Sequence, residues 1–132
     1  MKTITLIAKV VLSLIALMPV LGATGIFPPA TPDMYNTKEA YDFVTVLGEA
    51  YYIIFIMAVV NILAVIAFWT KREALGALLL LPISVNVVAF HTVLDGGIFT
   101  AGASLGNVML LLNLYFIWKY RAQYKAIIEK RS

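Results

Sequence analysis

Long apolar stretches alternate with short polar segments along the chain. Each stretch is about 20 residues long, which is the length of helix that crosses the hydrocarbon core of a bilayer. The four stretches cover approximately residues 3–27, 46–69, 74–94 and 102–118. Because the connecting segments are short, the pattern predicts a single membrane domain over residues 1–132, folded as an all-α integral membrane four-helix bundle.

The first apolar stretch also has features of a cleaved signal peptide. Lys2 precedes it, and small residues occur near its end, at residues 22–25. The stretch is long for a signal peptide, however, and it has no clear Ala-x-Ala cleavage site. We therefore expect it to remain in the protein as the first span.

Three prolines within residues 28–32 interrupt the helical pattern after the first span. Proline lacks a backbone donor and fixes φ, so this segment is predicted to be a loop. Asn36 and Glu39 have the spacing of a capping box, which predicts that a helix restarts at Thr37. The first turns of that helix are too polar for hydrocarbon, so we expect a short interfacial helix before the second span.

Basic residues indicate the orientation of the bundle. Only Lys38 lies on one side of the predicted membrane domain. The others lie on the opposite side, at the start of the chain, between the second and third spans and in a basic tail over residues 119–132: Lys2, Lys9, Lys71, Arg72, Lys119, Arg121, Lys125, Lys130 and Arg131. The positive-inside rule therefore predicts that both termini are cytoplasmic.

The composition limits the classes of function. With 62% hydrophobic and 13% charged residues, the chain is expected to contact membrane lipid. The net charge of +3 does not indicate nucleic-acid binding, because the basic residues flank apolar stretches. The absence of cysteine excludes thiol chemistry, iron–sulfur clusters and thiolate metal sites, so we expect neither a metal site nor an intrinsic cofactor.

The third span contains the most distinctive polar residues. His91 and Asp95 are four residues apart and share a helix face near the end of the span. The second span runs antiparallel to the third, which predicts that Glu49 lies at a similar depth, and Asn86 is another candidate ligand residue. Two interpretations remain open: these groups form a ligand site or proton relay, or His91 and Asp95 cap a helix end at interfacial water.

Further amides lie deeper in the predicted spans, at Asn61, Asn107 and Asn113. Amides within a membrane commonly form hydrogen bonds between helices, and this is the interpretation we prefer. The alternative is an amide that points at a bound ligand.

The motifs of several enzyme classes are missing. A single histidine cannot supply the paired axial ligands of a haem, and the chain has no HExxH motif and no glycine-rich phosphate loop. Ser84, His91 and Asp95 nominally provide a catalytic triad, but no nucleophile elbow surrounds Ser84. We therefore do not expect the chain to be an enzyme by itself.

One stretch of the third span resembles a known family. Residues 78–95 read LLLLPISVNVVAFHTVLD, in which Asn86, Phe90, His91 and Asp95 are more specific than general membrane-helix features. Together with the proline-rich first loop and the aromatic and basic end of the fourth span, this stretch resembles the DoxX-like family of small bacterial four-helix membrane proteins.

The resemblance implies a place in the inner (cytoplasmic) membrane, because the family is named after a membrane subunit associated with thiosulfate-to-quinone oxidation. Other members are linked to membrane complexes for oxidative stress. The missing catalytic motifs, and small residues in the third and fourth spans that suit helix association, lead us to expect a non-catalytic subunit or scaffold that has a protein partner or forms a homo-oligomer. The alternatives are a quinone-linked redox subunit with a polar pocket around His91 and Asp95, and a carrier for a small solute or protons.

Overall fold

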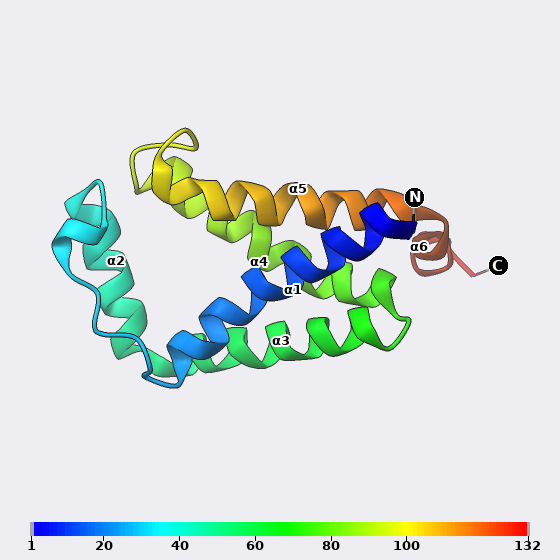
Figure 1. Cartoon of the computed structure of the whole chain (residues 1–132), viewed down its shortest axis with the longest axis horizontal. Helices are drawn as coiled ribbons and strands as arrows, with labels where there is room; N and C mark the ends of the chain where they lie inside the picture. Colours follow the sequence, from blue (N-terminus) through cyan, green and yellow to red (C-terminus); the bar gives the residue numbers. More distant parts are fainter. Residues whose placement is uncertain (1, 132) are drawn as a thin grey trace.

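The computed structural model describes residues 2–131, which form helices and connecting loops and contain no β-strand. The four long helices are α1 (Lys2–Ala23), α3 (Tyr51–Trp69), α4 (Glu73–Val93) and α5 (Ser104–Lys119). Helices α1 and α4 each pack against both α3 and α5, and the four lie side by side (Figure 1). The predicted all-α four-helix bundle is therefore confirmed.

Each helix of the bundle is long and apolar enough to cross a membrane, the fourth together with the 3₁₀ turn Ala101–Ala103 that precedes it. Large apolar side chains also cover the outside of the bundle. For example, Ile7 of α1 is 58% exposed and Leu111 of α5 is 67% exposed. Such a surface is unfavourable in water and suits the hydrocarbon of a bilayer. The protein is a multi-pass membrane protein with four spans.

Small residues allow the bundle helices to approach closely. A Cβ atom on Gly76 of α4 would lie 2.9 Å from the carbonyl oxygen of Ala64 in α3 and 2.9 Å from the ring of Phe68. Such close contact between backbones is typical of membrane helices that associate through glycine and alanine. The buried apolar core runs through all four helices: Ala8, Leu12, Ala16, Ala64, Phe68, Ala77, Leu80, Met109 and Phe116.

A short helix, α2 (Lys38–Glu49), lies at the end of the bundle that is remote from both termini and leans away from it (Figure 1). This confirms the predicted helix before the second span, but two details differ. Thr37 is the N-cap, because its Oγ1 accepts a hydrogen bond from Ala40 N at 3.1 Å, and Asn36 is not. The chain then breaks at Ala50, so the second span begins at Tyr51 rather than near residue 46.

The first span is also shorter than expected. Helix α1 ends at Ala23, before the predicted end at residue 27, because Gly25 has a positive φ of 77° that a helix cannot continue through. The turn between α3 and α4 is tight. Lys71 has a φ of 61°, and the backbone N–H of Arg72 donates to Ala67 O at 2.9 Å, which caps the end of α3 in a Schellman arrangement.

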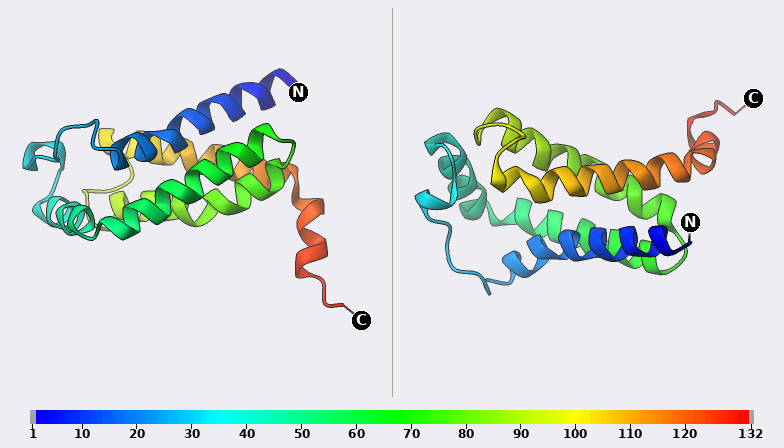
Figure 2. Two further views of the ribbon diagram at one scale, coloured as in Figure 1. Left: turned by 90° about the horizontal axis from the view of Figure 1, so that it is seen from below. Right: turned by 45° about the horizontal axis from the view of Figure 1, so that its top comes forward.

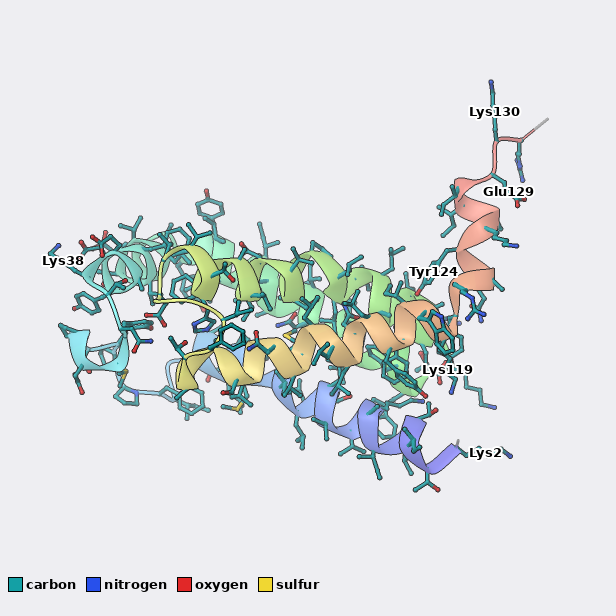
Figure 3. The ribbon with its side chains drawn as sticks, turned by 90° about the horizontal axis from the view of Figure 1, so that it is seen from above. Lys2, Lys38, Lys119, Tyr124, Glu129 and Lys130 are labelled. Carbon is teal, nitrogen blue, oxygen red and sulfur yellow. The ribbon has the colours of Figure 1, made fainter. Side chains whose placement is uncertain are left out.

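Both termini lie at the same end of the bundle (Figure 1). The basic tail forms another short helix, α6 (Arg121–Ile128), which turns away from α5 at Tyr120 (Figure 2). The hydroxyl of Tyr124 donates to Ala74 O at 2.6 Å and holds α6 against the start of α4. Lys38 marks the opposite end, whereas Lys2 and Lys130 lie at the end that carries the termini (Figure 3).

Candidate functional site

His91 and Asp95 form the hydrogen-bonded pair that their spacing predicts. His91 Nδ1 lies 3.1 Å from Asp95 Oδ2. Asp95 is only 2% exposed, although it follows the last turn of α4. If the carboxylate is ionised, the imidazole donates from Nδ1, which leaves Nε2 as its free position. The pair can therefore orient the imidazole toward a further polar group.

Asp95 also holds the loop that precedes α2. Its Oδ1 accepts from the backbone N–H of Asn36 at 2.8 Å, and the amide of Asn36 donates to the carbonyl oxygen of Asp95 at 3.2 Å. Next to it, the hydroxyl of Thr37 donates to Leu94 O. The carboxylate therefore uses Oδ2 to orient His91 on α4 and Oδ1 to hold the segment that leads into α2. The caps themselves are other residues, Leu94 at the end of α4 and Thr37 at the start of α2, so Asp95 links the two segments by a tertiary contact.

Two glycines make room for the imidazole. A Cβ atom on Gly102 would lie 3.6 Å from Cε1 of His91, and one on Gly106 would lie 3.8 Å from Cδ2. Since these glycines are four residues apart at the start of the fourth span, they present one small face to α4. The His91 side chain is packed against this face and remains 14% exposed.

Aromatic rings cover the same end of the bundle. The ring of Tyr35 lies 6.4 Å from that of Phe90, which lies 5.9 Å from the ring of Phe43 in α2. Burial, and then the nearby charge of Asp95, raise the pKa of Tyr35 above its usual value. Tyr35 therefore keeps its hydroxyl proton well above neutral pH, and its ring helps to fix the first loop on α4.

The other two candidate ligand residues do not join this pair. Glu49 is exposed on the last turn of α2 and lines a separate cavity. Asn86 is exposed on α4. No hydrogen bond or ion pair within residues 2–131 connects either of them to His91. The structure therefore brings together two of the four predicted residues.

Asn113 connects α5 to α4 in the middle of the bundle. When its amide atoms are assigned from their partners, Nδ2 donates to Ala77 O at 3.0 Å, and Oδ1 accepts from Ser84 Oγ at 3.0 Å and from Leu81 N at 3.1 Å. These contacts lie beside Pro82, which lacks a backbone N–H. Asn113 therefore links the two helices where a proline weakens the hydrogen bonding of α4.

The two remaining amides, Asn107 and Asn61, do not form the predicted hydrogen bonds between helices. The amide of Asn107 donates to Ile98 O at 2.7 Å and so holds the loop before α5 rather than another helix. Asn61 is fully buried in α3, and neither of its amide atoms has a hydrogen-bond partner within residues 2–131. An unsatisfied amide in the interior is energetically unfavourable, so Asn61 keeps unused hydrogen-bonding capacity inside the bundle.

The opposite end of the bundle contains an ion pair that the sequence analysis did not predict. Lys9 Nζ of α1 lies 2.7 Å from Glu73 Oε1 at the start of α4, and the two side chains are 15% and 16% exposed. The ammonium group also lies 5.4 Å from the centre of the Trp69 ring, whose N–H donates to Ser13 Oγ at 3.0 Å. Opposite charges at the same end of two spans were the available signal for this pair.

A second lysine extends the polar group at this end. Lys119 Nζ donates to Thr5 Oγ1 at 2.6 Å, and Thr5 Oγ1 lies 2.9 Å from the hydroxyl of Tyr115. Burial raises the pKa of Tyr120, and the carboxylate of Glu73 raises it further. Two partly buried polar groups therefore lie where α1, α4 and α5 meet at this end: the pair of Lys9 and Glu73, and the group of Lys119, Thr5 and Tyr115.

Comparison with known proteins does not assign a family. No protein-family model matches the chain, and no curated protein or solved structure matches it. The class that the fold defines is a four-span helical membrane protein with a polar group at each end of its bundle.

Proposed function

We propose that this four-span protein is a non-catalytic subunit or scaffold of a complex in the inner membrane, with both termini in the cytoplasm. The observation that carries the proposal is the position of Asn86. Its side chain is exposed on α4, in a segment that crosses the membrane. An amide that faces hydrocarbon has no water to bind, so a neighbouring protein helix is its best partner.

The surroundings of Asn86 favour a helix rather than a solvent channel. Pro82, Val85 and Ala89 are exposed on the same side of α4 and carry small or medium side chains. Such a face permits a second helix to approach closely enough for an interhelical hydrogen bond. Along the helix axis, Asn86 lies about 10 Å from Val93 at the end of α4, at a rise of about 1.5 Å per residue.

Two features of the sequence agree with this proposal. The stretch that resembles DoxX-like proteins includes Asn86, and members of that family are associated with membrane complexes. Lys2, Lys119 and Lys130 lie at the end that carries the termini (Figure 3), and basic residues gathered there support a cytoplasmic position for that end.

Replacing Asn86 with leucine is expected to weaken the association with a protein partner or a second copy. One interhelical amide bond contributes about 0.6–2 kcal/mol, so the amount of partner recovered at limiting concentration should fall about threefold to thirtyfold. The measurement is purification of the tagged protein from its native membrane in mild detergent, followed by quantitative mass spectrometry of the associated polypeptides.

Thr92→Val is the matched control. Thr92 is also exposed on α4, but its hydroxyl donates to Val88 O at 2.8 Å within the same helix. This substitution should leave the recovery of partner unchanged. If wild-type protein is recovered alone, or if Asn86→Leu retains the full amount of partner, the proposal is wrong.

A quinone-linked redox subunit is the second candidate, and the His91–Asp95 pair favours it. An imidazole that donates from Nδ1 to a carboxylate can take up a second proton at Nε2 and donate it to a quinone carbonyl oxygen. The same purified material distinguishes the two candidates. Quinone in its lipid extract that disappears in His91→Gln would support the redox candidate, whereas a polypeptide partner without quinone would support the scaffold.

A further inference from the structure

A cavity of about 830 Å³ lies at the end of the bundle that is remote from the termini. Its walls come from the end of α1, the proline-containing loop, α2 and the start of α3. The hydroxyl of Tyr51 donates to Ala23 O at 2.8 Å and joins α1 to α3 beside it. Figure 1 shows these elements at the end of the bundle where α2 leans away. Its volume falls within the range of small-molecule sites.

The cavity is mostly apolar and contains one charged residue. Met18, Ile54 and Met57 contribute apolar side chains from the spans. Glu49 is the only charged side chain among the lining residues, and no hydrogen bond or ion pair within residues 2–131 engages it. Because Glu49 is exposed at the edge of this mostly apolar cleft, its carboxylate is accessible to a ligand that combines a positive charge with an apolar part.

Two neighbouring aromatic rings also line the cavity. Tyr35 and Tyr41 both line the cavity, their ring centres are 6.2 Å apart, and their planes are inclined by 48°. Aromatic faces attract cations, and ammonium groups are commonly recognised by several rings together with a carboxylate. Tyr41 precedes Glu49 by eight residues, about 12 Å along α2, so the rings and the carboxylate attract a cation at two positions along the cavity.

The backbone around the cavity leaves its interior open. A Cβ atom on Gly48 would meet nothing within 4 Å, and one on Gly22 would meet only the Phe27 ring, at 3.8 Å. Pro28 and Pro29 form part of the opposite wall and limit its flexibility. The space is therefore available for an occupant without rearrangement of a packed core.

We propose that this cavity binds an amphiphilic cation, with its ammonium head at Glu49 and its apolar part against the ends of α1 and α3. Tyr51 and Tyr52 are 54% and 66% exposed beside it, which is typical of side chains at the membrane–water interface. The ligand is therefore reached from the interface. It is either the amine headgroup of a phospholipid or a free lipophilic amine.

The experiment is equilibrium binding of radiolabelled dodecyltrimethylammonium to the purified full-length chain in dodecyl maltoside, with protein-free micelles as the blank. Wild-type protein should bind saturably, with one probe per chain. Glu49→Gln should weaken binding about tenfold or more, because it removes the only opposite charge in the site. Gly48→Leu should also weaken binding, because it fills the open space while the charge remains.

Glu39→Gln is the matched control, because Glu39 lies in the first turn of the same helix and does not line the cavity. It should bind like the wild type. Added phosphatidylethanolamine identifies the source of the ligand: competition with the probe indicates a lipid headgroup, and saturable binding without competition indicates a free amine. The absence of saturable binding by the wild type, or equal binding by folded Glu49→Gln, would overturn the proposal.

Discussion

Lys9→Met is expected to lower the free energy of unfolding by about 3 kcal/mol. The reason is that Glu73 would keep its charge in a position where its side chain is only 16% exposed and its ammonium partner, now 2.7 Å away, is missing. A carboxylate that loses its direct partner at a partly buried helix end is more unfavourable than the absence of both charges. The measurement is the unfolding of the protein in mixed micelles as the fraction of sodium dodecyl sulfate increases, followed by circular dichroism.

The double variant Lys9→Met with Glu73→Leu is the control for this pair. It removes both charges and should recover more than half of the stability that Lys9→Met loses. If the effects of the two substitutions on the free energy of unfolding simply add, the account is contradicted. Additivity would mean that Lys9 extends to the lipid headgroups and does not depend on Glu73.

Gly76→Ala is expected to destabilise the bundle by about 1–3 kcal/mol, even though alanine is the better helix former. The added Cβ would lie 2.9 Å from a backbone oxygen of Ala64 and within 3.0 Å of the Phe68 ring. The backbone of α3 cannot rotate away as a flexible side chain would, so α3 and α4 must separate. The same unfolding assay in mixed micelles measures the effect.

Gly48→Ala provides the matched comparison. Gly48 is also inside a helix, but a Cβ atom there would meet nothing within 4 Å. This substitution should therefore be neutral or stabilise α2 by up to about 1 kcal/mol. Equal effects of the two substitutions would show that α3 and α4 are not in close contact at Gly76.

The sequence was sufficient to predict the features that depend on local spacing. Apolar stretches of about 20 residues correspond to helices because no other structure satisfies the backbone within a span. The His91–Asp95 pair was predictable for a similar reason. Residues four apart on one helix are neighbours whatever the rest of the fold does.

Features that depend on how the helices are placed in space could not be predicted in this way. Glu49 was expected near His91 because a continuous second span would bring it there. The break at Ala50 instead directs α2 away from the bundle, and no proline marks that position. The pair of Lys9 and Glu73 joins residues 64 apart in the chain, so it depends on how α1 and α4 are both packed against α3 and α5.

Asn36 shows how one residue can fit two roles, one local and one tertiary. Its spacing from Glu39 suits a capping box, but Thr37 takes the cap, and Asn36 bonds to Asp95 across 59 positions of the chain. Only the position of the first loop on α4 decides between these roles. Sequence spacing alone therefore overestimated the local interaction and missed the tertiary one.

The most direct test of the four-span architecture uses the fact that the chain contains no cysteine. Single substitutions Lys2→Cys, Lys38→Cys, Lys71→Cys and Lys130→Cys are labelled in sealed spheroplasts with a maleimide that does not cross membranes. We expect labelling of Lys38→Cys in intact spheroplasts, and of the other three only after lysis. Labelling of Lys2→Cys and Lys130→Cys from opposite sides, or of Lys38→Cys and Lys71→Cys from the same side, would contradict four spans with both termini in the cytoplasm.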